Sequence, residues 1–374
     1  MSTPDVVLLG YFGRGNFGDD ILMVVAHALA QQMLPGAQIA LRIGSSTNYP
    51  EKLLGPGISR IPFGTRDRHR LVLHGGGGTF FDFATHGRLH RFANALMLSA
   101  GTRTLVQIEG AIRQIVGRQR LSARTRLGLG LGIGTFTPGS PKLRDALPVL
   151  ADFDALWLRD ADSVANLARL GVSPPVVRGS DLAFLWEHWC PPELALARSR
   201  QKTARPRVGV ILRDWPVGSG ISFAQDFAPV LERLSKHYEL TLISLDPETD
   251  SGTLTALLHL PHVVWRPEQT SIGEFVKEIA EQDVLLTSRA HGAICGACVG
   301  RSSVILGIEP KLKAVHAMLP EATRIVMPPY RKDAVICKIE EALAISLDSV
   351  AADAQRNRSE SQSAMNSLLE RLNP

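Results

Sequence analysis

Short apolar runs alternate with segments of helical periodicity along most of the chain. The apolar runs are rich in Val, Leu and Ile, and most end in Gly, Ser, Asp or Arg before a helical segment begins. Strands that alternate with helices in this way form a parallel sheet with helices on both faces. The pattern predicts strands at 6–11, 39–43, 71–74, 105–108, 127–133, 155–158, 208–212, 239–245, 284–286 and 304–308. It predicts helices at 21–33, 88–99, 222–236, 271–280, 333–346 and 348–372, and further helices after Asp160, Ser288 and Lys311.

The length of the chain and one irregular segment predict two domains. A chain of 374 residues exceeds what a single hydrophobic core usually serves. Residues 191–206 are rich in Pro, Arg and Lys and lack periodicity, so we interpret them as a linker. The prediction is an N-terminal lobe at 1–190, a C-terminal lobe at 207–346 and a C-terminal helix at 347–374. The fold class is α/β, with two Rossmann-like lobes that face each other across a cleft.

Composition limits the classes of partner. The net charge is +5, from 41 Lys and Arg against 36 Asp and Glu, and only 6% of the residues are aromatic. This excess of positive charge is too small to indicate nucleic acid, and few aromatic side chains are present to stack on bases. A mildly basic surface suits a small anionic substrate, or an anionic lipid surface that carries one.

Targeting and cysteine patterns indicate a reduced, intracellular protein. The N-terminal residues lack the basic region of a signal peptide, and no apolar run approaches the roughly 20 residues of a membrane span. We therefore expect a cytoplasmic protein whose contact with the inner face of the membrane, if any, is peripheral. Cys295 and Cys298 form a C-x-x-C pair without a second pair at zinc-site spacing, so we expect packed, reduced thiols and no metal site.

The segment 288–311 carries the strongest chemical signal. An apolar strand leads into Ser288, a favourable N-cap, and places Arg289 and His291 in the first turn of a helix of small residues. A helix N-terminus with an Arg fork suits a phosphate or carboxylate. The next strand brings Lys311 to the same sheet edge, where ligands of open α/β sheets bind. The alternative is an ordinary strand–helix–strand unit with surface Arg and His side chains.

A glycine-rich loop follows the first strand. Gly13-x-Gly15-x-x-Gly18 matches the dinucleotide-binding fingerprint, but the second strand ends in Arg42 and Ile43 without the acid that binds a ribose. Two acids at the helix start would repel a pyrophosphate. We therefore favour a hydroxyl-rich ligand, and an NADP enzyme remains an alternative. The polar groups for this ligand are Asn16, Asp19 and Asp20, although Asp19 has the alternative role of a helix cap.

A second glycine run follows the third strand, at Gly75–Gly78. Four successive glycines are costly in backbone entropy, so such a loop is kept where a ligand or another backbone approaches closely. We expect His74 and Gly76 to lie beside the ligand, and Asp82 to supply a carboxylate in the cleft.

Together these motifs resemble the polysaccharide pyruvyl transferase family, over about residues 5–320. Two departures are Ala290, where many members have Leu, and Glu309-Pro310, where an aromatic residue is usual. The motifs, in order, are Gly-Asn-Phe-Gly-Asp-Asp-x-Leu at 15–22, Leu-His-Gly-Gly-Gly at 73–77, Leu-Arg-Asp-x-x-Ser at 158–163, Leu-x-x-Leu-Gly at 167–171, Asp-Leu-Ala-Phe at 181–184 and Ser-Arg-x-His-Gly at 288–292.

The resemblance implies a GT-B-like fold and a transferase of exopolysaccharide or other cell-envelope biosynthesis. Family members transfer the enolpyruvyl-derived group of phosphoenolpyruvate to a sugar, often forming a cyclic ketal, and use phosphoenolpyruvate as a co-substrate without another cofactor. The acceptor would be a polysaccharide or a lipid-linked oligosaccharide. The implied donor-binding residues are Arg289, His291, Lys311 and Arg159, and Arg213 joins them because it ends the strand 208–212.

The chemistry of this transfer assigns further roles. His291 would protonate the methylene carbon of the donor, and Asp20 or Asp82, with Asp19 as a further choice, would act as the base. The acceptor-binding residues would be Asn16, Asp19, Asp20, His74 and Gly76.

Two other classes of function remain open. A GT-B glycosyltransferase would bind a nucleotide sugar, with Glu309 on the ribose, and a non-catalytic assembly or regulatory protein would keep only the fold. The acceptor sugar, the choice between ketal and enolpyruvyl ether, and the oligomeric state are not determined by the sequence.

Overall fold

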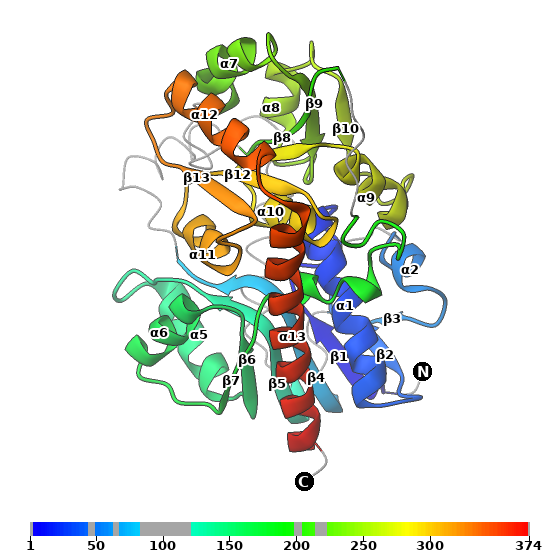
Figure 1. Ribbon diagram of the computed structural model, residues 1–374. Helices are drawn as coiled ribbons and strands as arrows, with labels where there is room; N and C mark the ends of the chain where they lie inside the picture. The colour runs from blue at the N-terminus through cyan, green and yellow to red at the C-terminus, as the bar shows by residue number, and fades with distance from the viewer. Residues whose placement is uncertain are drawn as a thin grey trace, which may run out of the picture.

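The computed structural model describes residues 3–43, 49–62, 67–82, 121–197, 204–213 and 223–372. Two sheets, one from each half of the chain, lie one above the other with helices on their faces (Figure 1). The first sheet has the order β3-β2-β1-β4-β5-β6-β7 and the second has the order β10-β9-β8-β11-β12-β13. Neighbouring strands pair in parallel in both. The predicted fold class, two Rossmann-like α/β lobes with C-terminal helices, is confirmed.

The first lobe contains β1 (Val6–Leu9), α1 (Phe17–Met33), β2 (Ile39–Leu41), α2 (Tyr49–Leu54), β3 (Ser59–Arg60), β4 (Arg68–Phe80), β5 (Ser122–Ile133), α5 (Pro141–Ala151), β6 (Ala155–Leu158), α6 (Ala161–Arg169), β7 (Val176–Arg178) and the 3₁₀ helices η1 (Leu182–Phe184) and η2 (Trp186–His188). The second contains β8 (Arg207–Ile211), α7 (Phe223–Leu234), β9 (Glu239–Ser244), α8 (Ser251–Ala256), β10 (His262–Val264), α9 (Ile272–Ala280), β11 (Val284–Thr287), α10 (Ala290–Cys298), β12 (Ser302–Leu306), α11 (Pro310–Met318), β13 (Thr323–Val326), α12 (Lys332–Leu343) and α13 (Leu347–Leu372). The predicted helix 88–99, the predicted strand 105–108 and part of the predicted linker 191–206 lie outside the described residues.

The second glycine run is not the loop that the sequence predicts. Strand β4 continues through it to Phe80, and Gly75 and Gly77 pair with Leu129 and Leu131 of β5. A Cβ atom at Gly76 would lie 2.9 Å from Leu22 of α1. The glycines therefore allow α1 to lie directly on the carboxyl end of the sheet, because a larger side chain there would push the helix away.

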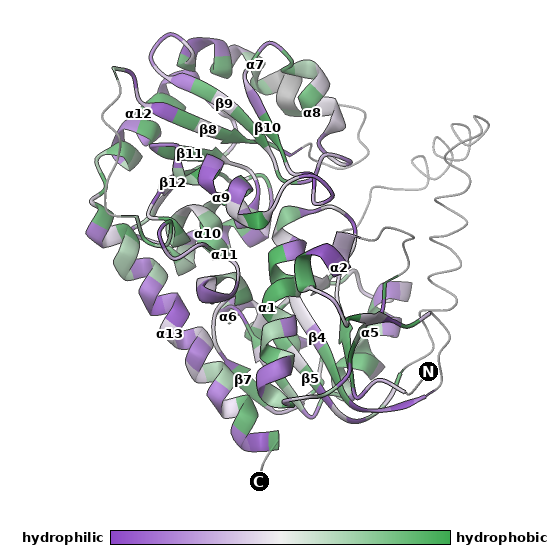
Figure 2. Ribbon diagram, turned by 90° about the vertical axis from the view of Figure 1, so that its right-hand side faces the viewer, coloured by the Kyte–Doolittle hydropathy of each residue, from purple (hydrophilic) through white to green (hydrophobic). Residues whose placement is uncertain are grey.

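Helix α1 connects the two lobes through its N-terminal turn. The backbone N–H of Phe17 donates to the carbonyl of Leu245 at 2.8 Å, and its ring packs edge-on against Trp265 and at a tilt against Phe275. Both rings belong to the second lobe and are fully buried. Figure 2 shows that α1 is largely hydrophobic along its length. The start of α1 is thus fixed at the junction of the lobes.

Helix α13 runs along both lobes, although its sequence is polar (Figures 1 and 2). Its buried Asp353 accepts hydrogen bonds from the backbone N–H groups of Glu321 and Ala322 in the second lobe. Its Asn357 accepts from Ser180 of the first lobe and donates to the carbonyl of Met318. Polar side chains that bond to backbone groups therefore help to dock this helix, together with its buried apolar residues Val350, Met365 and Leu368.

Three cysteine side chains are packed inside the protein. Cys190, Cys295 and Cys298 are free and buried, as expected, and burial raises the pKa of the Cys295 and Cys298 thiols well above the ordinary range. Within the described part of the chain, no helix combines the length and apolar character that a membrane span requires.

Candidate functional site

The carboxyl ends of the two sheets face each other, and the N-termini of α1 and α10 meet between them. The contact is made by Gly18 of α1 and His291 of α10. A Cβ atom at Gly18 would lie only 1.9 Å from Nδ1 of His291, so the imidazole packs on the bare backbone of the facing lobe. This contact brings two predicted motifs, 13–20 and 288–292, into one site.

The start of α10 differs in detail from the prediction. Arg289, not Ser288, is the N-cap residue, and the hydroxyl of Ser288 accepts instead from the backbone N–H of Arg213 at 2.8 Å. The small residues of α10 allow it to lie against β11. A Cβ atom at Gly292 would be 2.3 Å from Oγ1 of Thr287, and one at Gly296 would be 2.5 Å from Leu285. The small residues therefore serve close packing of helix on strand.

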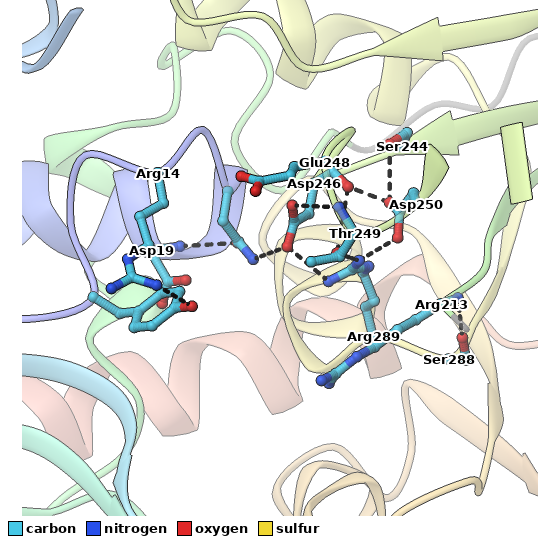
Figure 3. A network of polar contacts seen from close by, with 12 residues as sticks. Arg14, Asp19, Arg213, Ser244, Asp246, Glu248, Thr249, Asp250, Ser288 and Arg289 are labelled. Carbon is cyan, nitrogen blue, oxygen red and sulfur yellow. Dashed lines mark hydrogen bonds and ion pairs between the residues drawn. The ribbon is translucent and has the colours of Figure 1, made fainter. Parts of the chain in front are cut away.

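Arg289 lies in a polar network that crosses from one lobe to the other (Figure 3). Its guanidinium donates to Thr249 at 2.8 Å and pairs with Asp250, and Nη1 lies 3.7 Å from Oδ2 of Asp246. Asp246 also accepts from Nδ2 of Asn16 at 3.1 Å, and Asn16 in turn caps α1 by accepting from the N–H of Asp19. Asn16 thus holds the lobes together, a role that differs from the predicted contact with an acceptor.

Each of the other predicted donor-binding cations is also paired with a carboxylate. The Arg159 guanidinium donates to Asp181 at 2.9 Å and to Asp160 at 3.3 Å. Arg213 and Lys311, the latter inside the first turn of α11, lie 3.2 Å and 2.8 Å from the same oxygen of Glu309. Arg159 is buried and Arg213 and Lys311 are half-buried, and cations removed from water need counter-ions because desolvation is costly. The site is therefore close to electrically balanced before a ligand arrives, rather than an exposed cationic cluster.

These paired groups converge on His291. Burial lowers the pKa of His291 to about 4; the charge of Asp181 opposes this shift, whereas those of Arg159, Lys311 and Arg289 reinforce it. Nε2 of the ring is buried without a hydrogen-bond partner and lies 3.9 Å from Oδ1 of Asp181. At pH 7 the imidazole of the free protein is therefore neutral.

The neighbouring carboxylates of α1 have different surroundings. Asp20 is fully buried and accepts from the indole N–H of Trp265 at 2.8 Å and from the Tyr49 hydroxyl at 2.9 Å. Burial raises the pKa of Asp20 to about 7, and these two hydrogen bonds oppose the rise. Because both oxygens are occupied at the lobe interface, Asp20 does not suit the predicted roles of base and acceptor ligand.

Asp19 is the carboxylate that faces the site. It is half-buried, and a Cβ atom at Gly77 would lie 3.6 Å from its Oδ1. Burial, followed by the charge of Asp20, raises the pKa of Asp19 to about 7, while the charges of Lys311 and Arg289 lower it. A carboxyl group with a pKa near neutrality can both release and accept a proton at physiological pH.

The remaining predicted residues of the first lobe are His74, Asp82 and Gly76, and each contacts other side chains of that lobe. His74 is enclosed by Phe80 and Phe153, lies 3.2 Å from Nη1 of Arg126, and has a pKa lowered to about 3 by burial. It therefore packs within the first lobe, and its role as an acceptor ligand stays a prediction. Asp82, two residues beyond β4, lies 3.9 Å from Lys142 of α5, and Gly76 is covered by Leu22.

A groove of about 950 Å³ opens between α6, α11 and α13, and Arg159 lies in its wall. Its rim carries Asp162, Arg178, Lys313 and Glu360, which are exposed. The groove exceeds the needs of a three-carbon donor and approaches the upper end of the ~300–1,000 Å³ range of small-molecule sites. Within the described residues, no three His, Cys, Asp or Glu side chains lie together as metal ligands would.

Several residues of this site were not predicted from the sequence. Asp246 and Asp250 follow β9, so acids after an apolar strand were an available signal. Asp181 belongs to a motif that was noted without a role. Trp265 and Tyr49 carried no local signal, because their importance comes from the position of Asp20 in the folded protein.

Comparisons with solved structures agree with this architecture. A putative UDP-N-acetylglucosamine 2-epimerase from Listeria monocytogenes is 12% identical with a TM-score of 0.56, covering 98% of this chain and 95% of that one. The Anabaena protein Alr3699/HepE in complex with UDP-glucose is 11% identical with a TM-score of 0.54, covering 97% and 99%. A glycosyltransferase from Rickettsia africae ESF-5 is 10% identical with a TM-score of 0.54, covering 98% and 97%. At these identities the likeness shows the GT-B fold alone.

Family membership comes from the sequence comparison. No curated protein matches this chain. The model of the family described as polysaccharide pyruvyl transferase matches residues 16–310, which include α1, the glycine-rich β4, Arg159, Asp181 and the start of α10. The chain belongs to the polysaccharide pyruvyl transferase family.

Proposed function

We propose that the protein transfers the enolpyruvyl-derived group of phosphoenolpyruvate to a sugar, forming a pyruvate ketal and releasing phosphate. The observation that carries this proposal is His291, at the N-terminus of α10, surrounded by Arg159, Arg289 and Lys311 and facing α1. Helix N-termini and such cations suit a phosphate and a carboxylate in one small ligand. Family membership supports the same reaction.

Donor binding is coupled to protonation in this proposal. The cations are already paired with Asp181, Asp250 and Glu309, so a further anion brings uncompensated negative charge into the site. Such a charge raises the pKa of nearby groups. His291, neutral in the free protein, and Asp19, with a pKa of about 7, are the groups able to take up protons.

The chemical steps follow from these groups. The protonated His291 gives its proton to the methylene carbon, which leaves a cation-like centre at the adjacent carbon. A sugar hydroxyl adds there as Asp19 accepts its proton. The C–O bond to phosphate then breaks, and a second hydroxyl closes the ketal as its proton passes to the departing phosphate. Arg159, Arg289 and Lys311, with Arg213 beside them, stabilise the departing phosphate. Asp20 is less suited to the base role because both of its oxygens accept hydrogen bonds, and Asp82 lies beside Lys142.

We further propose that the sugar chain of the acceptor occupies the groove between α6, α11 and α13. Acids and bases on its rim can bond to many hydroxyl groups, and its volume suits more than one sugar unit. The acceptor is an exopolysaccharide or another envelope glycan, bound as a polymer or a lipid-linked oligosaccharide at the cytoplasmic face of the membrane.

The test is a phosphate-release assay with phosphoenolpyruvate and a panel of aryl and lipid-linked glycosides. The ketal and the enolpyruvyl ether are isomers with the same mass, so NMR must show a methyl group, not a methylene. In deuterium oxide the wild-type methyl should contain deuterium. His291→Gln should keep most donor affinity and lose about 10²–10⁴ in turnover. Wild-type turnover in this variant would remove His291 from the mechanism.

The alternative is transfer from a nucleotide sugar. The likeness to Alr3699/HepE with UDP-glucose favours it at the level of the fold, and Glu309 has a second oxygen buried without a hydrogen bond. Calorimetry with UDP and with phosphoenolpyruvate separates the two proposals. Binding of UDP without binding of phosphoenolpyruvate would decide for the nucleotide sugar.

A further inference from the structure

Asp181 lies where the two lobes meet beneath the site, and its side chain is fully buried. It precedes η1 in the first lobe, and its Oδ1 accepts from the backbone N–H of Ala183 at 3.0 Å. Its Oδ2 accepts from Nη1 of Arg159 at 2.9 Å. These contacts hold the carboxylate in one orientation, with Oδ1 directed towards the second lobe.

The second lobe presents His291 to that oxygen. Nε2 of the ring is buried without a hydrogen-bond partner, and it lies 3.9 Å from Oδ1 of Asp181. The opposite edge of the ring, with Nδ1, lies against Gly18 of α1. This distance is longer than a hydrogen bond, but the charge of a carboxylate 3.9 Å from Nε2 already favours the tautomer with a proton on that nitrogen, and such contacts commonly shorten when a ligand binds.

We propose that Asp181 is a positioning residue for His291. It accepts the Nε2–H hydrogen bond, keeps the neutral ring in the Nε2–H tautomer, and leaves Nδ1 as the nitrogen that carries the transferred proton. The inference rests on the proposed role of His291 as proton donor. When the imidazolium protonates the methylene carbon, the Nδ1–H bond breaks and the new C–H bond forms. The ring returns to the neutral Nε2–H form, and no proton passes to Asp181.

Other charged groups facing His291 do not replace Asp181. Arg159 at the end of β6, Arg289 before α10 and Lys311 in α11 are cations, so each disfavours the imidazolium. Asp181 supplies the opposing charge. A fixed carboxylate beside a histidine stabilises the imidazolium and selects its tautomer, and loss of such a group changes the tautomer while the geometry stays intact.

The competing explanation is that Asp181 only holds Arg159 and η1. Asp160 provides the matched control, because it pairs with Arg159 at 3.3 Å and caps α6 through the N–H of Ser163 at 2.6 Å. The structure gives Asp160 no contact with His291. Asn at position 160 can still cap the helix, so Asp160→Asn tests the loss of a carboxylate partner of Arg159 alone.

The experiment is ¹⁵N NMR of histidine-labelled, ligand-free protein at pH 7, with the His291 signals assigned by their loss in His291→Gln. Wild type and Asp160→Asn should show a single Nε2–H tautomer, whereas Asp181→Asn should show a mixture. Turnover of Asp181→Asn should fall by about 10²–10⁴. A dominant Nδ1–H tautomer in wild type, or an unchanged tautomer in Asp181→Asn, would overturn the proposal.

The NMR measurement still tests the proposal if Asp181→Asn does not fold, or if the protein does not use phosphoenolpyruvate. If Asp181→Asn does not fold, the wild-type tautomer still tests the proposal, because Nδ1–H would contradict it and a single Nε2–H would support it. If the wild-type protein does not use phosphoenolpyruvate, the proposed function fails. The tautomer comparison in ligand-free protein would still report whether Asp181 positions the ring.

Discussion

The imidazole of His291 occupies the space in which a side chain at Gly18 would begin. A Cβ atom there would lie 1.9 Å from Nδ1, closer than atoms can pack, although the two residues belong to different lobes. The motif at 13–20 therefore requires glycine at position 18, because the ring of His291 occupies the adjacent space. The position of the proposed proton donor therefore depends on the relative orientation of the two lobes.

Gly18→Ala should displace the His291 ring and lower turnover by about 10²-fold, since a shift of about 1 Å in a reacting group has an effect of that size. Donor affinity should change less than turnover. Gly78→Ala is the matched control, because a Cβ atom there meets Phe81 at an ordinary 3.5 Å. Steady-state kinetics of both variants would test the contact, and equal activity would show that the ring is not fixed by Gly18.

Arg289→Ala should weaken phosphoenolpyruvate binding about tenfold or more, because charge-assisted hydrogen bonds contribute roughly 1.5–3 kcal/mol each. It should also lower the free energy of unfolding by about 3–5 kcal/mol, because Asp250 is left buried without its partner. Arg289→Ala with Asp250→Asn should recover part of the stability but not the donor affinity. Denaturant unfolding measures the stability and calorimetry measures the donor affinity. If the double variant recovered both, Arg289 would have a structural role only.

Phosphoenolpyruvate binding should be accompanied by net proton uptake at pH 7. The pKa of His291 is about 4 and that of Asp19 about 7 in the free protein, and an anionic donor raises both. Calorimetry in two buffers of different ionisation enthalpy gives the number of protons. The number of protons taken up should be smaller in His291→Gln. Any proton taken up by the donor itself is the same in both proteins, so it does not contribute to the difference. Equal uptake in both proteins would show that His291 stays neutral in the complex.

The burial of Asp20 should make stability depend on pH. The pKa of Asp20 is raised to about 7 from an ordinary 3.8, so between these values the folded protein holds a proton that the unfolded chain releases. The free energy of unfolding should therefore fall as the pH rises from about 4 to 7. This slope should be shallower in Asp20→Asn, and urea unfolding across that range measures it. A steeper slope in the variant would contradict the assignment.

Ala317→Trp should fill the groove between α6, α11 and α13. Ala317 is exposed in its wall, so the substitution should leave stability and the KM for phosphoenolpyruvate unchanged. If the groove holds the distal sugars of the acceptor, the KM for oligosaccharides should rise severalfold more than that for a monosaccharide glycoside. A uniform change for all acceptors would place the sugar chain elsewhere.

Local patterns in the sequence determined the alternation of strands and helices, the two lobes and the family motifs. Each depends on neighbours along the chain: apolar runs of strand length, helical periodicity, and glycines or caps at element ends. The same information located Arg289, His291, Lys311 and Arg159 at the carboxyl ends of strands, where the structure brings them together. The glycine run was misjudged because glycine in sequence indicates backbone freedom, whereas here it accommodates Leu22 of α1 within a strand.

Only the tertiary structure decided which charges are paired and which face the site. Asp19 and Asp20 are adjacent in sequence, yet one lies near Lys311 and Arg289 and the other is bound by Trp265, 245 positions away. The partners of Asn16, Arg289 and His291 likewise come from distant segments, and Asp181 reaches His291 across the lobe interface. Electrostatic energy depends on distance and desolvation in space, which sequence separation does not encode.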